Sequence, residues 1–98
     1  MIKGIIWCND IENGLEKLNS VIKDYKPFYD ISWKVSSKDS SIVVFSNNDI
    51  WEVLTTKHNG YGVRCNISYI DHNIDKEYIE SVIIPATISL PFSGIQYY

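Results

Sequence analysis

The residues best suited to chemistry lie between Gly60 and Asp71, a segment that combines glycines, an arginine, an apolar strand and an acid. Its second half, from Ile67 to Asp71, is an apolar run that ends in a carboxylate. Open α/β sheets place their ligands at the carboxyl ends of strands. Asp71 is therefore predicted to be a polar anchor for a ligand. The alternative interpretation is that Asp71 only forms a turn and that His72 beside it is simply exposed.

The loop that precedes this strand carries cationic and aromatic side chains among glycines. His58, Tyr61 and Arg64 lie here, close to Lys57. Backbone amides beside glycines and cationic donors bind anions such as phosphate. We therefore predict that His58, Tyr61 and Arg64 contact a ligand. The alternative is a plain connection in which Arg64 forms a salt bridge.

Aromatic residues make up 13% of the chain, a dense supply for its length. Aromatic rings stack on nucleobases, and they also anchor protein interfaces. Trp7 and Phe45 lie in apolar runs and are predicted to belong to the core. Trp51 lies beside Glu52 on an alternating strand, which favours a surface position. Trp51 is therefore predicted to be a fourth ligand contact.

The pattern of apolar residues predicts one α/β domain over residues 1–98, with a mixed, mainly antiparallel sheet of about five strands and two helices. Strands are expected at 2–8, 31–35, 41–45, 50–54 and 67–70. Helices are expected at 11–25, after a cap at Asn9 or Asp10, and at 75–84, where Pro85 ends the second helix. The predicted order is β-α-β-β-β-β-α.

Two further expectations concern how these elements are arranged. The run 41–45 is apolar throughout and is predicted to be the central strand. Residues 86–98 contain Pro91, Gly94 and several aromatics without a helical period, and are predicted to form an extended tail. A sheet of this size leaves one face hard to cover, so we expect a homo-oligomer in which the tail helps to cover it.

Three segments in the middle of the chain resemble the second half of the ATPase core in the large terminases, the DNA-packaging motors of tailed phages. They are Phe45 to Ile50, Gly62 to Arg64, and Ile67 to Asp71. In that family the acid that ends the strand positions magnesium beside nucleotide phosphates. The resemblance implies a phage or prophage origin. It also assigns to Asp71 the place of that acid.

The chain departs from the terminase pattern at two places that catalysis needs. None of the glycines begins a Gly-x-x-x-x-Gly-Lys-Ser/Thr loop, and His72 follows Asp71 where the family has a glutamate. Phosphoryl transfer depends on gathering the phosphates and on positioning the attacking group. The chain is therefore predicted not to be an enzyme, and no cofactor or metal site is expected.

Composition excludes several partners. The net charge is -3 and 21% of residues are charged, so the positive field that attracts duplex DNA is missing. Cys8 and Cys65 are far apart and have no zinc-type spacing, which predicts reduced thiols. Cys8 precedes Asn9 and Asp10, but a buried thiol is favoured over a nucleophile. No segment is apolar over the length of a membrane span, so the chain is predicted to be a small acidic protein of the host cytoplasm.

The preferred function is a small non-catalytic binding protein that is encoded by a phage or prophage. It would sequester a nucleotide-type ligand, or block a host defence protein in an anti-defence role. The first alternative is a packaging accessory subunit that completes a nucleotide site in trans through Arg64 and Asp71. The second alternative is a structural interaction module without a ligand.

Overall fold

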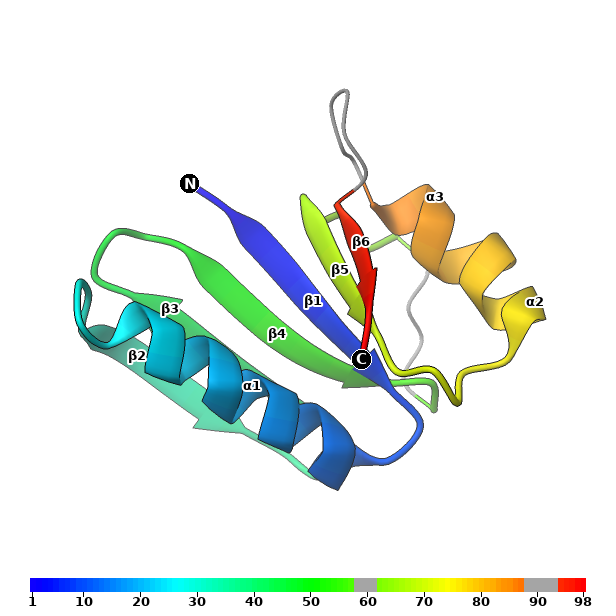
Figure 1. The fold of residues 1–98 in the computed structure, drawn as a ribbon, viewed down its shortest axis with the longest axis horizontal. Coiled ribbons are helices and arrows are strands. Elements are labelled where there is room, and N and C mark those ends of the chain that lie inside the picture. The colour runs from blue at the N-terminus through cyan, green and yellow to red at the C-terminus, as the bar shows by residue number, and fades with distance from the viewer. Residues whose placement is uncertain (58–61, 88–93) are drawn as a thin grey trace.

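The computed structural model describes residues 1–57, 62–87 and 94–98, and shows a single α/β domain with one six-stranded mixed sheet (Figure 1). Each helix and strand begins and ends at the following residues: β1 Lys3–Cys8, α1 Ile11–Tyr25, β2 Ile31–Ser36, β3 Ser40–Phe45, β4 Ile50–Thr55, β5 Ile67–Ile70, α2 Lys76–Tyr78, η1 Ile79–Ile83, α3 Ile84–Ala86 and β6 Ile95–Tyr97. The predicted α/β class and the order of its first seven elements are confirmed. No helix in the described ranges is both long and apolar enough to cross a bilayer.

The sheet has the strand order β2-β3-β4-β1-β5-β6. The β2, β3 and β4 strands form the predicted antiparallel meander, whereas β1 runs parallel to both β4 and β5, and β5 runs parallel to β6. Three of the five pairings are therefore parallel, so the expectation of a mainly antiparallel sheet is corrected. Such pairings join segments that are distant in sequence, and local patterns do not reveal them.

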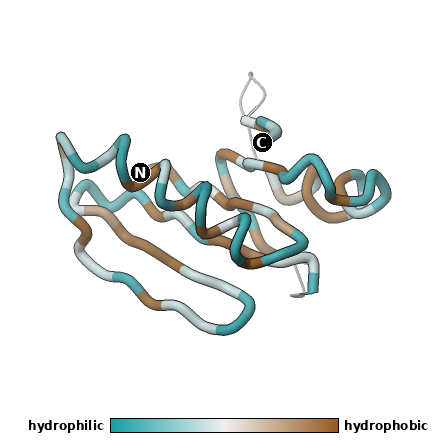
Figure 2. Tube along the Cα trace, turned by 60° about the horizontal axis from the view of Figure 1, so that its bottom comes forward, coloured by the Kyte–Doolittle hydropathy of each residue, from teal (hydrophilic) through white to brown (hydrophobic). Residues whose placement is uncertain are grey.

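The central position in the sheet belongs to β1 together with β4. Ile5 and Trp7 point to the face that the C-terminal helical segment covers, while Ile6 and Cys8 point to the face that α1 covers. All four are completely buried. The prediction that 41–45 forms the central strand is wrong, because β3 lies second from the edge and buries only alternate residues. Figure 2 shows the resulting hydrophobic runs along the strands.

The first helix, α1, has the predicted bounds. Asp10 caps it, and its carboxylate accepts a hydrogen bond from the N–H of Glu12 at 3.1 Å. Gly14 allows α1 to lie close to the sheet, because a Cβ at this position would lie 2.5 Å from Val53 Cγ1 and 2.7 Å from Cys8 Sγ. The cap and the close approach together place the start of α1 directly beside the end of β1.

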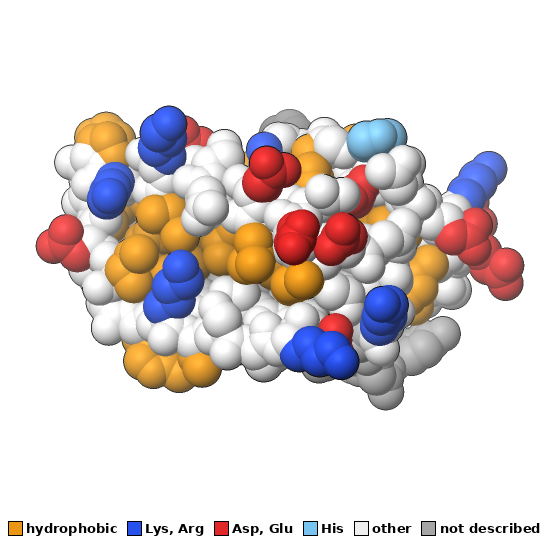
Figure 3. Space-filling model, turned by 90° about the horizontal axis from the view of Figure 1, so that it is seen from below, with side chains coloured by type: hydrophobic (Ala, Val, Ile, Leu, Met, Phe, Trp, Pro, Cys, Tyr) orange, Lys and Arg blue, Asp and Glu red, His pale blue; other side chains and the backbone are white. Residues whose placement is uncertain are grey.

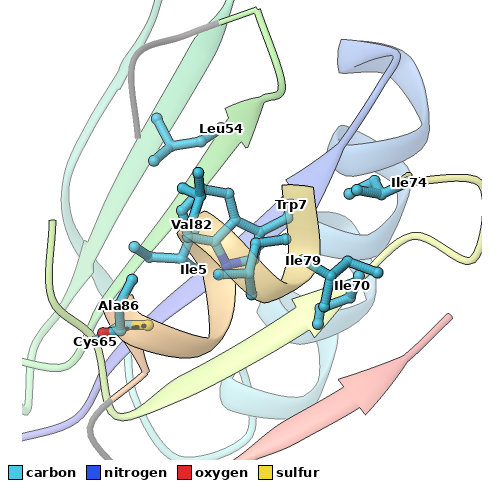
Figure 4. Packing of buried hydrophobic residues seen from close by; sticks show 10 residues of the cluster. Ile5, Trp7, Leu54, Cys65, Ile70, Ile74, Ile79, Val82 and Ala86 are labelled. Atoms are coloured by element: carbon cyan, nitrogen blue, oxygen red, sulfur yellow. Dashed lines mark hydrogen bonds between the residues drawn. The ribbon is translucent and has the colours of Figure 1, made fainter. Parts of the chain in front are cut away.

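The second helical segment runs without interruption from Lys76 to Ala86 and contains a π-helical turn, η1. Its apolar face packs on β1 and β5, and its buried residues surround Trp7 (Figure 4). Pro85 lies inside the last turn, so the predicted stop before Pro85 is corrected by two residues. A proline has no N–H to donate to the preceding turn, and the helical segment ends one residue after it, at Ala86.

Near the end of the chain, Ile95–Tyr97 form strand β6 of the sheet, which corrects the expectation of an extended surface segment for this part of the tail. The β6 strand pairs in parallel with β5, and the N–H of Ser68 donates to the carbonyl of Gly94 at 2.7 Å. Gly94 lies so close to the backbone of Asn66 that a Cβ would not fit there. The Tyr98 hydroxyl also donates to the carbonyl of Trp7 at 2.9 Å. The described end of the tail therefore pairs within its own domain, and the predicted contact of the tail with a neighbour stays a prediction.

A buried carboxylate at the amino end of the sheet makes stability depend on pH. Asp49 is 6% exposed and accepts hydrogen bonds from the N–H of Ile2 at 2.8 Å and from the hydroxyl of Tyr25 at 2.7 Å. Burial alone would raise the pKa of Asp49, but these hydrogen bonds outweigh it and hold the pKa below its ordinary value. The ionised form is therefore the one that the folded state favours.

Because the folded pKa of Asp49 lies below the unfolded one, its stabilising contribution is present above about pH 4 and is lost as the pH falls through the folded pKa. We expect Asp49→Asn to lower the free energy of unfolding most near about pH 6, and progressively less below about pH 4. Denaturant titrations of wild type and variant at several pH values measure this difference. Asp24→Asn, at an exposed position on α1, is the control. An Asp49→Asn effect that does not change with pH would contradict the assignment.

Candidate functional site

The carboxyl ends of β4, β1 and β5 lie at one edge of the sheet, because these strands are parallel. After β1 the chain enters α1 on one face, and after β5 it enters the helical segment on the other face. The point where consecutive connections leave to opposite faces is where open α/β sheets form a ligand crevice. In this chain the point lies between β1 and β5, next to Asp71.

Asn9 joins the segments that meet at this edge. Its Nδ2 donates to the carbonyl of Asn73 at 2.9 Å, and its Oδ1 accepts from the hydroxyl of Thr56 at 2.9 Å. The N–H of Thr56 also donates to the carbonyl of Cys8 at 2.9 Å. The ends of β4 and β1 and the turn after β5 are thus held in fixed positions relative to one another.

Asp71 is the most deeply buried carboxylate at this edge, with 2% of the residue exposed. Its Oδ1 accepts from the N–H of Asn73 at 2.9 Å, and its Oδ2 accepts a longer bond from Nδ2 of Asn13 at 3.4 Å. The nearest cationic candidate is His72, whose Nδ1 lies 3.6 Å from Oδ1. A carboxylate offers about four acceptor positions, so Asp71 retains capacity for donors on a ligand.

A hollow of about 330 Å³ lies beside Asp71, between α1 and the ends of β5 and β6. It is lined by Asn13, Glu16, Lys17, Ser20, Asp71, His72 and Tyr98, and we call it the Asp71 hollow. Figure 3 views the molecule from this side and shows acidic and basic side chains interspersed over the surface. The Asp71 hollow thus combines the buried carboxylate of Asp71 with the cationic side chain of Lys17 and the aromatic ring of Tyr98.

Neighbouring side chains fix the positions of the aromatic rings in and beside the Asp71 hollow. Lys17 Nζ lies 4.7 Å from the ring centroid of Tyr69 and 6.0 Å from that of Tyr98, within the range of cation–π attraction. Burial, followed by the nearby Cys8 and Asp71, raises the pKa of the Tyr98 hydroxyl far above its ordinary value, so it stays neutral. His72 Nδ1 lies 2.8 Å from the main-chain oxygen of Tyr98, which positions the imidazole at the rim.

Two other hollows lack a buried charged group among the described residues that line them. One of about 320 Å³ lies across the start of α1, where the charges of Lys38 and Lys57 are balanced by those of Asp10 and Asp39. Among the described residues, the buried hydroxyl of Thr55 beside it has no hydrogen-bond partner. A larger one of about 500 Å³ is lined by α1 alone, away from the strand ends. We place the candidate site in the Asp71 hollow because it contains a buried charged group at the switch point.

Among the described residues, the structure separates Arg64 from Asp71, which were predicted to act at one site. His58 and Tyr61 lie outside the described residues. Arg64 is exposed, and its Nη1 donates to the carbonyl of Val63 at 2.9 Å. Arg64 precedes the amino end of β5 and Asp71 follows its carboxyl end, and a four-residue strand alone spans about 13 Å. Arg64 is therefore not part of the Asp71 hollow.

The surface position expected for Trp51 is wrong. The residue is 3% exposed, and its ring stacks on Tyr69 at a centroid distance of 5.1 Å. Its Nε1 donates to the Tyr25 hydroxyl at 3.1 Å, and Gly4 leaves room for the ring. Alternation along β4 correctly indicates that one face is buried. It does not tell which face α1 covers, and the covered face is the one that carries Trp51.

Cys8 is the predicted buried thiol. It is fully buried, and its Sγ lies 3.7 Å from the carbonyl oxygen of Leu54. Burial raises the pKa of this thiol to about 11, although a hydrogen bond from the N–H of Gly14 acts in the opposite direction. The thiolate needed for nucleophilic attack is thus disfavoured. Within the described ranges, no three His, Cys, Asp or Glu side chains converge as metal ligands.

Sequence reasoning missed the part of the Asp71 hollow that α1 and β6 supply. A signal was present for α1, since a helix capped at Asp10 starts at the carboxyl edge and carries Asn13 and Lys17 on one face. For Tyr98 there was no comparable signal, because its place depends on β6 joining the sheet.

Comparison of the chain with protein-family models, with curated proteins and with solved structures gives no match. The terminase resemblance therefore stays a prediction that rests on the three segments quoted for it. A fold does not determine a function, so the case for function rests on the candidate site.

Proposed function

We propose that this protein is a non-catalytic binding protein that takes a nucleotide-type ligand in the Asp71 hollow. The observation that carries the proposal is the buried Asp71 carboxylate, which has spare acceptor capacity and lies at the switch point of the sheet. A buried carboxylate is costly unless donors satisfy it, and within the described residues Asp71 accepts from Asn73 and, at 3.4 Å, from Asn13, with His72 Nδ1 at 3.6 Å. A ligand that donates hydrogen bonds to Asp71 would supply them.

The chemistry of the surrounding groups supports a nucleotide over a purely apolar ligand. Amino groups of a base or hydroxyl groups of a ribose are suitable donors to Asp71, and Lys17 offers a cation to a phosphate. The rings of Tyr98 and His72 provide surfaces on which a base can stack. A volume of about 330 Å³ is at the small end of the range for ligand sites, which favours mononucleotides.

The groups that line the Asp71 hollow support binding without turnover as the proposed mode of action. Phosphoryl transfer requires several donors that gather the phosphates, and Lys17 is the cationic side chain among the lining residues. The alternative of a packaging accessory, in which Arg64 and Asp71 complete a nucleotide site in trans, stays a prediction. Because the two residues lie at opposite ends of β5, they would have to reach such a site from different copies of the chain.

The phage origin and the anti-defence role remain predictions from the resemblance. Of the two anti-defence roles, the Asp71 hollow favours sequestration of a nucleotide. Blocking of a host defence protein would need an exposed apolar surface instead. Large hydrophobic side chains are exposed along β2, among them Trp33 and Val35, but the present proposal rests on the Asp71 hollow.

The proposed function predicts that nucleotides stabilise the folded protein. We expect at least one nucleotide in a screen of mono-, di- and cyclic nucleotides to raise the melting temperature, since a ligand at 100 times its Kd adds about 2.7 kcal/mol of stability. A thermal-shift assay measures this, and equal concentrations of inorganic phosphate and of ribose serve as controls. If no nucleotide stabilises the protein, the proposed function is wrong, and the interaction module without a ligand becomes the better account.

A further inference from the structure

Asp71 and Asn13 place hydrogen-bonding groups of opposite kind side by side in the Asp71 hollow, and both residues line it. An ionised carboxylate only accepts hydrogen bonds, whereas the NH2 group of an asparagine carries two donor hydrogens. Nδ2 of Asn13 lies 3.4 Å from Oδ2 of Asp71. A ligand in the hollow therefore meets a donor directly beside a pair of acceptors.

This pair of side chains retains hydrogen-bonding capacity. Each oxygen of a carboxylate offers about two acceptor positions. Within the described residues, Oδ1 of Asp71 accepts from the N–H of Asn73 and Oδ2 accepts the long bond from Asn13, while Nδ1 of His72 at 3.6 Å is beyond hydrogen-bond distance of Oδ1. The second hydrogen of the Asn13 NH2 group is also available. The complementary ligand has two neighbouring donors with an acceptor beside them.

Among the common nucleobases, guanine carries this arrangement on its Watson–Crick edge. Its N1–H and N2–H2 groups are adjacent donors, and its O6 is an acceptor beside them. Adenine and cytosine have a ring-nitrogen acceptor next to the amino group, and uracil has one N–H between two carbonyls. These acceptors would lie against a carboxylate oxygen of Asp71, which disfavours binding.

The charges of the hollow favour the base, and not the phosphate, as the part of the ligand at Asp71. A phosphate beside Asp71 would face a like charge. Lys17 follows Asn13 by four residues on α1, which corresponds to about 6 Å along the helix, and it offers a cation to a phosphate at that distance. We propose that the Asp71 hollow selects guanine nucleotides, with Asp71 accepting from N1–H and N2–H2 and Asn13 donating to O6. This inference rests on the proposed function.

Nucleotides that differ in single groups test this selection, with isothermal titration calorimetry as the measurement. IMP lacks only the N2 amino group of GMP, and we expect it to bind about 10-fold or more weakly, because it loses a hydrogen bond to a charged group. AMP turns an acceptor toward Asp71 and should bind about 100-fold or more weakly. Equal affinities for GMP, IMP and AMP would overturn the proposal.

The hydroxyl groups of a ribose are the other neighbouring donors in a nucleotide, and dGMP separates the two sources. With guanine at Asp71, dGMP should bind like GMP, because the 2′-hydroxyl is not read. A loss of about 10-fold or more for dGMP, without discrimination among the three bases, would place the ribose at Asp71 and contradict the selection of guanine.

Asp71→Asn provides a readout that a merely structural role would not change. Asparagine presents one acceptor and one donor, which complement the N1–H and the O2 carbonyl of xanthine. We expect this variant to bind XMP more tightly than GMP, and the wild type to show the opposite order. Glu77→Gln makes the same chemical change at an exposed position and should keep the wild-type order.

Two results separate a failure of this inference from a failure of the proposed function. An Asp71→Asn variant that still prefers GMP over XMP would show that Asp71 does not read the base, although nucleotides bind. A wild type that binds none of the nucleotides would overturn both the selection of guanine and the proposed function.

Discussion

Trp7→Ala is expected to lower the free energy of unfolding by about 3 to 5 kcal/mol. Trp7 lies on the central strand and is completely buried between the sheet and the π-helical turn (Figure 4). Its ring meets Tyr78 edge to face at 6.2 Å, and its Nε1 donates to the hydroxyl of Ser68 at 3.0 Å. Truncation would leave a large cavity that the surrounding residues cannot fill by small movements.

Chemical denaturation at neutral pH measures this loss, and two further variants interpret it. Trp7→Phe keeps most of the ring but removes the donor to Ser68, so it should cost less than Trp7→Ala. Trp33→Ala removes the same side chain from a position that is 54% exposed, and in dilute protein it should cost about 1 kcal/mol or less. A similar cost for Trp7→Ala and Trp33→Ala would show that Trp7 is not a core residue.

Asp71→Asn is expected to weaken nucleotide binding by about 10- to 100-fold. Asparagine has nearly the same shape and can still accept the N–H of Asn73, but it lacks the negative charge. Hydrogen bonds to a charged group contribute about 1.5 to 3 kcal/mol, which corresponds to this loss of affinity. Isothermal titration calorimetry with the most stabilising nucleotide measures it.

Two control variants locate the effect of Asp71→Asn. Glu77→Gln makes the same chemical change at an exposed position and should leave the affinity unchanged. Arg64→Ala should also leave it unchanged, because Arg64 lies at the other end of β5. A loss of affinity in Arg64→Ala with none in Asp71→Asn would move the ligand to the loop that contains His58 and Tyr61, as the sequence alone predicts.

Local sequence patterns predicted most of the elements. The α1 helix has a strong apolar period, a cap at Asp10 and a stop at Lys26–Pro27, and its bounds are confirmed. The three strands of the meander and β5 lie within about one residue of their predicted ranges, because turn clusters separate them. Such features depend on contacts between residues that are close in sequence.

Features that depend on distant contacts were not predicted. The pairing of β1 with β4 and β5 decides which strand is central, and nothing in the run 41–45 reveals it. Residues 95–97 have no strand pattern of their own in the sequence, and they form a strand because they pair with the edge of β5. Tertiary packing also decided the burial of Trp51. The candidate site was therefore predicted only in part. Asp71 could be identified from its own strand, whereas Lys17 and Tyr98 lie beside it only because α1 and β6 pack next to β5 in the folded sheet.

The most direct test of the account is to map the ligand site by amide chemical-shift perturbation in isotope-labelled protein. On titration with the most stabilising nucleotide, we expect the largest shifts at the residues around the Asp71 hollow, namely Asn13, Lys17, Asp71, His72 and Tyr98. The amides of Arg64 and of β2 should change little. Largest shifts near Arg64 or along β2, with none at the five expected residues, would contradict the proposal that this edge of the sheet binds the ligand.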